Sequence, residues 1–312
     1  MMIQNLKHIL TIFFFFLMLV TPDIIFSAAS DGLLLWFQIV LPTLLPFLII
    51  SSFLLHTPAI HLLVRITAPF FCRLFHVSKY GSFAVLCGFL CGYPMGGKIT
   101  SDLLISGKIT PSEASYLLSF CNNTSPMFII SYVMHQNLNA PHLILPALAI
   151  LFLSPVLCSF IFRPFYNLTN ENQQLLCPDI PQQNDKTEGS LIDECIMKSF
   201  ETITKIGGYI ILFSILIQLI KSIPATHLLI KYLLLPFLEI TNGVLSLSKS
   251  LISFQDKFVI IMALISFGGW CSIAQTQSMI AKAQIPLFPY IIEKLITALV
   301  TSLLTLLFFR LY

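Results

Sequence analysis

The stretch Leu117–Val133 (LLSFCNNTSPMFIISYV) places polar groups inside a segment that is otherwise apolar. Proline removes a backbone donor and interrupts a helix, so we expect Pro126 to free carbonyl groups about one turn earlier. The amides and hydroxyls beside it can pair with those carbonyls or with a solute. The pattern predicts a broken helix whose polar side chains line a substrate cavity. These side chains are Asn122, Asn123, Thr124 and Ser125.

Two other apolar segments are interrupted by glycine and end in polar groups, Cys87–Asp102 (CGFLCGYPMGGKITSD) and Ser266–Ser278 (SFGGWCSIAQTQS). Irregular backbone survives in a membrane only inside protein or beside a water-filled cavity. Interrupted segments at matching places in two halves of a chain point to a transporter binding site. We therefore predict a substrate site built from Gly92, Tyr93, Pro94, Gly96, Gly97, Lys98, Asn122, Asn123, Ser125, Gly268, Gly269 and Gln275.

The same residue types also serve helix packing, which is the alternative interpretation of each cluster. Asn, Ser and Thr join transmembrane helices at about 0.6 kcal/mol per hydrogen bond. Lys98 has three interpretations. It supplies positive charge to an anionic substrate, it extends to the membrane interface, or it pairs with Asp102 one helical turn away.

The composition requires the elements around these segments to lie in a membrane. Of 312 residues, 56% are hydrophobic and 10% are charged, whereas soluble domains carry about 25% charged residues. We predict an all-α, polytopic integral membrane protein with about eight hydrophobic segments, some of them broken or re-entrant. Lys and Arg number 17 against 14 Asp and Glu, a balance that excludes a large nucleic-acid-binding surface.

No enzyme signature is present, because the chain lacks G-x-S-x-G, H-E-x-x-H, P-loop and dinucleotide motifs. We expect no enzymatic activity and no cofactor. Most of the eight cysteines lie in or beside apolar runs, which favours buried, inert thiols over a metal site. The expected partners are a small-molecule substrate and the lipid bilayer; self-association is left open.

Changes of composition divide the chain into four parts. Residues 1–31 are predicted to form an N-terminal transmembrane helix that is retained, although its small residues near Ala28 also fit a cleaved signal peptide. Residues 32–163 form a first membrane half, 164–190 a polar linker and 191–312 a second membrane half. The halves share a loose pattern, since GSFAVLCGFLCGYPMGG resembles DKFVIIMALISFGGWCSIAQ in the position of its glycines.

The region Gly88–Ile129 resembles the sporulation integral membrane protein family YlbJ, also called SpoVV, among the nucleoside-recognition Gate-domain membrane proteins. The family pattern G-[FY]-x-x-G-Y-P-x-G-[AG]-K is matched from Gly88 to Lys98, and F-C-N-N-x-x-P from Phe120 to Pro126. A later glycine-rich turn, Gly268–Gln275, is also similar. The chain departs from the family at Ile273, where a His is expected, which removes a polar group from the implied site.

The resemblance implies two Gate-like halves in a transporter of a bacterial inner membrane, with the outer forespore membrane of a sporulating cell as the alternative location. It implies a small polar or anionic solute, with dipicolinic acid (pyridine-2,6-dicarboxylate) as the first expectation. A nucleoside-type transporter and a non-transport scaffold or assembly factor for sporulation are the alternatives.

Overall fold

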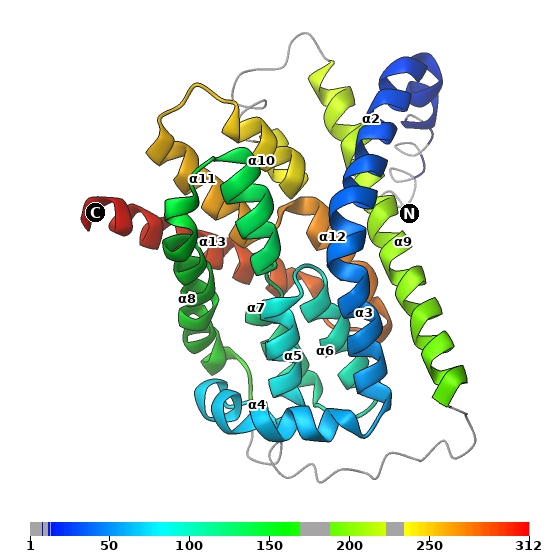
Figure 1. Cartoon of the computed structure of the whole chain (residues 1–312), viewed down its shortest axis with the longest axis vertical. Helices are drawn as coiled ribbons and strands as arrows, with labels where there is room; N and C mark the ends of the chain where they lie inside the picture. The colour runs from blue at the N-terminus through cyan, green and yellow to red at the C-terminus, as the bar shows by residue number, and fades with distance from the viewer. Residues whose placement is uncertain (1–7, 9–11, 13, 169–187, 223–233, 312) are drawn as a thin grey trace.

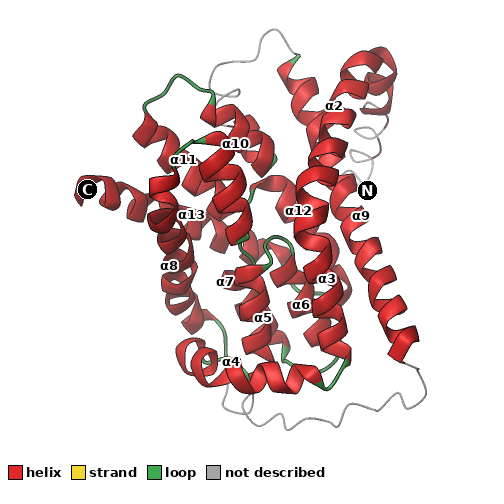
Figure 2. Ribbon diagram, viewed as in Figure 1, coloured by secondary structure: helices red, strands yellow, loops and turns green. Residues whose placement is uncertain are grey.

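The computed structural model describes residues 8, 12, 14–168, 188–222 and 234–311. Helices are the only regular secondary structure in these ranges (Figure 2), which confirms the predicted all-α class. Of the predicted linker at 164–190, residues 169–187 lie outside the described residues.

Five helical stretches are long and apolar enough to cross a membrane, and a bent pair makes a sixth if it counts as one span. The protein is therefore a polytopic membrane protein. The first stretch joins α2 (Pro22–Leu35), η1 (Trp36–Val40) and α3 (Leu41–His56), so it runs through the expected boundary at residue 31. The other four are Pro141–Phe165 around α8 (Ile144–Phe162), Gly189–Lys221 within α9 (Glu188–Lys221), Phe254–Ala283, which contains α11 (Phe254–Phe267) and α12 (Gly269–Ile280), and Leu287–Leu311, which is α13.

The remaining hydrophobic segments are shorter helices inside the molecule, which explains why about eight segments were predicted and fewer span. These are α5 (Lys79–Leu90), α6 (Met95–Ile105), α7 (Pro111–Cys121), η2 (Phe128–Asn137) and α10 (Ile240–Ser248). A helix of 11 residues is about 16 Å long, roughly half of the hydrocarbon thickness. Each of them therefore reaches only part of the way across.

The short helices form two groups. In Figure 1, α5, α6 and α7 lie in the lower half of the molecule, and α10 and the first part of α11 lie in the upper half. Hydroxyl side chains begin several of these helices, because each accepts a hydrogen bond from a free N–H of the first turn. Ser78 caps α5, Thr110 caps α7 and Ser253 caps α11.

Helix α4 (Ala59–Phe75) meets α5 at an angle of 90°, and Figure 1 shows it lying across the lower end of the molecule. Its residues Ile60, Val64 and Ala68 are buried on one face, whereas Arg65 and Arg73 are on the other. This one-sided pattern is typical of a helix that lies in the membrane interface.

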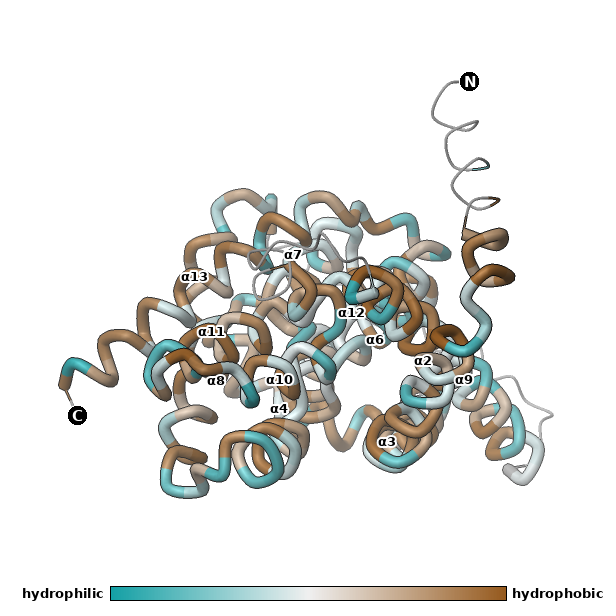
Figure 3. The backbone as a smooth tube through the Cα atoms, turned by 90° about the horizontal axis from the view of Figure 1, so that it is seen from above, coloured by the Kyte–Doolittle hydropathy of each residue, from teal (hydrophilic) through white to brown (hydrophobic). Residues whose placement is uncertain are grey.

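Large apolar side chains are exposed around the outside of the bundle. Leu145 on α8 and Leu299 and Leu303 on α13 are each more than half exposed, and hydrophobic residues follow α2, α3 and α13 in Figure 3. In contrast, buried Ser, Thr, Asn and Gln residues gather between the short helices. The molecule is thus apolar where lipid contacts it and polar inside.

Candidate functional site

Four interruptions of helices meet at one cavity of about 80 Å³. They lie between α5 and α6, between α7 and η2, before α10, and between α11 and α12. Because backbone groups at such ends lack helical partners, their gathering creates a polar region inside the membrane. The breaks contribute Gly92, Tyr93, Thr124, Ser125, Glu239 and Ile240 to the cavity wall, and the first turns of α12 contribute Cys271, Ser272 and Gln275.

Two glycines have the backbone conformation that the breaks require. Gly92 has φ = 93° and Gly268 has φ = 90°, values in the left-handed region that other residues rarely adopt. Both are also in close contact with a neighbouring break. A Cβ on Gly92 would lie 3.0 Å from Ser125, and one on Gly268 would lie 2.7 Å from the Tyr93 ring. The peptide bond between Tyr93 and Pro94, where α6 begins, is cis.

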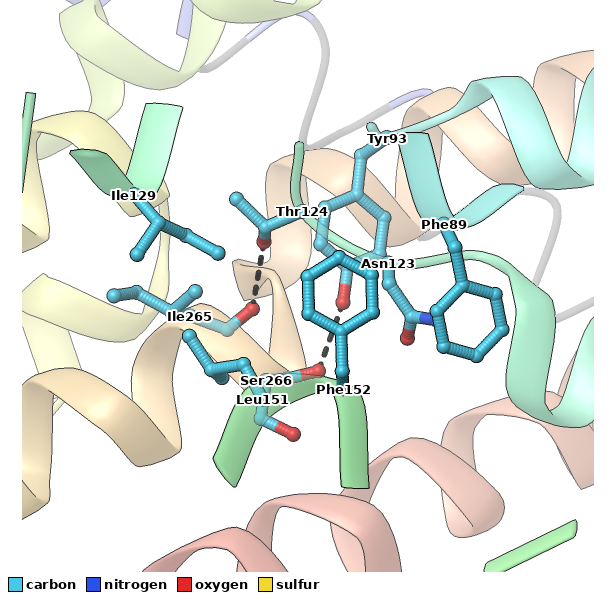
Figure 4. Close-up of a pocket in the computed structure, with 9 residues that line it drawn as sticks. All are labelled: Phe89, Tyr93, Asn123, Thr124, Ile129, Leu151, Phe152, Ile265 and Ser266. Carbon is cyan, nitrogen blue, oxygen red and sulfur yellow. Dashed lines mark hydrogen bonds between the residues drawn. The ribbon is translucent and has the colours of Figure 1, made fainter. Parts of the chain in front are cut away.

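Hydrogen bonds between the breaks hold them together. The Tyr93 hydroxyl donates to the Ser266 carbonyl at 2.8 Å, and the Thr124 hydroxyl donates to the Ile265 carbonyl at 2.9 Å. Both acceptors lie in the last turn of α11, as Figure 4 shows. The N–H of Cys271 donates to the Leu238 carbonyl at 2.8 Å, which joins the start of α12 to the break before α10.

Asn122 lies fully buried at the end of α7 and connects three other elements. Its amide nitrogen donates to Thr276 on α12 at 2.9 Å and to Tyr290 on α13 at 2.8 Å. Its amide oxygen accepts from the N–H of Gly97 on α6 at 3.3 Å. The Asn122 side chain thus links the end of α7 to α6, α12 and α13. It does not line the cavity.

Pro126 has a different role from the predicted one. Residues 122–125 are not helical, and Pro126 begins the next helical segment, a position where its missing N–H is not needed. The carbonyls are freed by the end of α7 itself. Asn123 re-pairs one of them by donating to the Phe120 carbonyl at 2.7 Å.

Lys294 on α13 supplies a buried positive charge at this break. Its side chain is among the largest fully buried ones, at 1% exposure of the residue. The ammonium donates to the Asn122 carbonyl at 3.1 Å and to the Asn123 amide oxygen at 3.3 Å. It also lies 4.9 Å from the centroid of the Tyr93 ring, a distance suited to a cation–π contact.

A second, larger cavity of about 310 Å³ lies beside α7 and α13. Glu293 and Tyr290 form part of its wall together with Tyr166, whose hydroxyl donates to the Glu293 carboxyl. Tyr290 also accepts the hydrogen bond from Asn122. The buried layer of Asn122 and Tyr290 therefore connects the broken helices with the wall of this second cavity.

The structure places the predicted site residues in three groups. Gly92, Tyr93, Ser125 and Gln275 line the cavity between the breaks, and Asn123 lines a smaller adjoining one of about 10 Å³ (Figure 4). Pro94, Gly96, Gly97, Asn122, Gly268 and Gly269 shape the breaks or pack against them. Lys98 lines neither of these two cavities. Its ammonium lies 2.5 Å from the Asp102 carboxylate, so Lys98 forms the ion pair that was one of its three interpretations.

Sequence reasoning missed Lys294, Glu293 and Glu239. The available signal was the dipeptide Glu293–Lys294 within the apolar segment LFPYIIEKLITALV, since ionisable residues inside a transmembrane helix are usually functional. Ile273, which occupies the expected His position, belongs to the hydrophobic core and does not line the cavity. The absence of the expected His side chain at this position therefore leaves the residues of the cavity wall unchanged.

These features define a polytopic helical membrane protein whose broken helices surround an internal polar site. The chain is a homologue of the sporulation integral membrane protein YlbJ of Bacillus subtilis (strain 168). The two are 26% identical over an alignment of 349 residues, which covers 98% of this chain and 85% of that protein. No family model matches the chain, and no solved structure matches it significantly.

Proposed function

We propose that the protein is a transporter that moves a small anionic solute, dipicolinate, across a bacterial membrane during sporulation. The observation that carries the proposal is the convergence of four helix breaks on one cavity, whose wall combines polar groups of the breaks with apolar residues of η1, α3 and α9. Secondary transporters bind substrates at such places, because half-helix ends offer unpaired backbone groups near the middle of the bilayer.

Donors at the cavity favour an anion. Within the described residues, the backbone N–H groups of Thr124 and Ser125 have no hydrogen-bond acceptor. In the described part of the chain, the Gln275 amide nitrogen donates only to the weak acceptor Cys271 Sγ, at 3.4 Å. Carboxylate oxygens bind N–H donors more strongly than neutral oxygens do, so a dicarboxylate fits these groups.

The charges around the cavity also favour an anion. Among the described residues, the one carboxylate in its wall is Glu239. It accepts from the N–H groups of Thr241 and Asn242 at 3.0 and 2.8 Å and from the Asn242 amide at 2.9 Å, at the start of α10, where the helix dipole offsets part of its negative charge. In contrast, the charge of Lys294 lies directly behind Tyr93 and Asn123. A positive charge without a counter-carboxylate attracts an anion over short distances in a region of low dielectric constant.

The size of the cavity fits a closed state. About 80 Å³ is well below the volume of roughly 300 Å³ or more that is usual for ligand pockets. Solute entry therefore requires the upper and lower groups of short helices to separate, as in alternating access.

Gln275 provides the test. We expect dipicolinate to raise the thermal unfolding midpoint of the purified protein, and Gln275→Leu to weaken dipicolinate binding by about 1.5–3 kcal/mol, the value of a hydrogen bond to a charged group. This corresponds to roughly tenfold or more in Kd. The matched control is Gln277→Leu, which makes the same change on the exposed face of α12 and should leave binding unaltered.

The outcomes separate the candidate functions. Stabilisation by a nucleoside in place of dipicolinate would favour the nucleoside-type transporter. Stabilisation by neither compound would refute the proposed solute site and favour the scaffold. Equal dipicolinate binding by both leucine variants would exclude Gln275 from the site.

A further inference from the structure

Lys294 lies at a position that a free cation would favour. The Asn122 carbonyl that it contacts is at the C-terminal end of α7, where helix carbonyls lack donors and the helix dipole is negative. Half-helix ends and unwound carbonyls of this kind coordinate the coupling Na⁺ or H⁺ in secondary transporters. Here the ammonium of a side chain already has these ligands.

The ligands of Lys294 are neutral. Among the described residues, no carboxylate lies within 4.0 Å of its ammonium. The neighbouring Glu293 faces the second cavity, where Tyr166 donates to it. Loss of the proton from Lys294 would therefore leave no buried carboxylate unpaired, whereas an ion pair would make that loss costly.

The other titratable groups that face Lys294 are weak acids, neutral near pH 7. They come from the elements packed on α13: Tyr93 at the first break, Cys121 on α7, Cys158 on α8, and Tyr290 on α13 itself. Helix α11 contributes hydroxyl groups such as Ser266, which accepts from Thr301 at 2.8 Å. Its own charged residues, Asp256 and Lys257, are in its first turn, far from the break. Among these facing groups, Lys294 is thus the one that carries a charge.

The ammonium also contacts the residues that border the cavities. Asn123 and Tyr93 both touch it, and both line cavity walls. A change in the charge of Lys294 would alter the two contacts that fix this part of the break. Protonation of the side chain and the conformation of the solute site are therefore linked through direct neighbours.

We propose that Lys294 replaces a soluble coupling cation, so that solute transport is coupled to protons and needs no Na⁺. The inference rests on the proposed transport function. In the coupling step, Tyr93 and Asn123 move away from the ammonium and admit water from the cavity that they line; one Nζ–H bond then breaks, the proton passes to that water, and the electron pair stays on the amine. Reprotonation from water on the other side of the membrane restores the ammonium.

The test uses the purified full chain in liposomes, with dipicolinate as the solute. We expect an inward proton gradient to increase initial uptake several-fold, and equally in Na⁺ or K⁺ medium. Lys294→Met should lose this response. Lys294→Arg should lose it too, because arginine keeps its proton. The control is Lys205→Met, which removes an exposed ammonium on α9 that pairs with Glu201 and should retain the full response.

Uptake driven by a Na⁺ gradient, or a normal proton response in Lys294→Met, would overturn the inference. A second measurement does not depend on transport. The thermal unfolding midpoint of the wild-type protein should be the same in Na⁺ and K⁺, and a specific rise in Na⁺ would overturn the assignment. If dipicolinate moves under no gradient, the proposed function fails, and this midpoint alone decides whether Lys294 fills the cation position.

Discussion

Two adjacent amides at the end of α7 have unlike surroundings. Asn122 is fully buried with partners on α6, α12 and α13, whereas Asn123 is partly exposed and borders a cavity. From the sequence, either amide could pair with freed carbonyls or with a solute. In the structure Asn123 pairs with a freed carbonyl and borders a cavity, and Asn122 joins the helices.

We expect the two alanine variants to differ in kind. Asn122→Ala leaves the buried Gly97 N–H without its acceptor, which costs about 1–3 kcal/mol, so it should reduce the amount of folded protein in the membrane. Asn123→Ala should accumulate normally but transport dipicolinate more slowly, since it loses a ligand of Lys294. Fluorescence-detected gel filtration measures the first and liposome uptake the second. Two variants with normal abundance and normal uptake would exclude the pair from the site.

The sequence indicated which residues interrupt the helices, but not which residues those interruptions contact. The glycines and Pro94 were identifiable because they interrupt apolar runs, and the polar residues beside them lie at the breaks as expected. The partners of Asn122 could not be identified from the sequence, because Lys294 and Tyr290 belong to a helix more than 160 positions later in the chain. A hydropathy pattern gives no distance between segments, so it could not show that Lys294, rather than Lys98, carries the charge at the break.

At the scale of elements, small residues allow the half-helices to approach closely. A Cβ on Gly88 of α5 would lie 1.7 Å from the Cys121 carbonyl oxygen, and one on Gly96 of α6 would lie 2.3 Å from it. Both contacts are with backbone, which cannot rotate away. The end of α7 is thus held between α5 and α6 by two glycines.

Gly88→Ala is therefore expected to destabilise the protein by about 1–3 kcal/mol or more, the usual cost of overpacking. The measurement is the thermal unfolding midpoint in detergent. Gly208→Ala is the matched control, because it is an exposed helical position with no atom within 4 Å of the new Cβ. It should be neutral or slightly stabilising through helix propensity. An unchanged midpoint for Gly88→Ala would mean that the packing of these helices is not tight.

The repeated pattern in the sequence has a counterpart in the elements. Helices α5 and α6 are separated by Gly92, and α11 and α12 by Gly268, each with positive φ. Breaks were predictable because glycine pairs within apolar runs are unusual. The number of true spans was less predictable, since an apolar half-helix and an apolar span have the same composition and differ only in length and direction.

For the whole molecule, an apolar exterior surrounds a polar interior at which broken helices meet. Helix packing accounts for buried Asn, Ser and Thr, but a scaffold does not need a buried ionisable side chain such as Lys294, because such residues inside a membrane are rare and usually functional. One cavity lies among the breaks and another beside α7 and α13, and the hydrogen-bonded pair of Asn122 and Tyr290 connects the broken helices with the wall of the second one. In the proposed transport function, this pair belongs to the barrier that a solute passes.

The most direct test of this account is the rate of dipicolinate uptake into liposomes that contain the purified wild-type protein. The account predicts saturable uptake well above that of protein-free liposomes, reduced in Gln275→Leu and retained in Gln277→Leu. Uptake equal to that of protein-free liposomes, from folded protein at pH values on either side of neutrality, would contradict it.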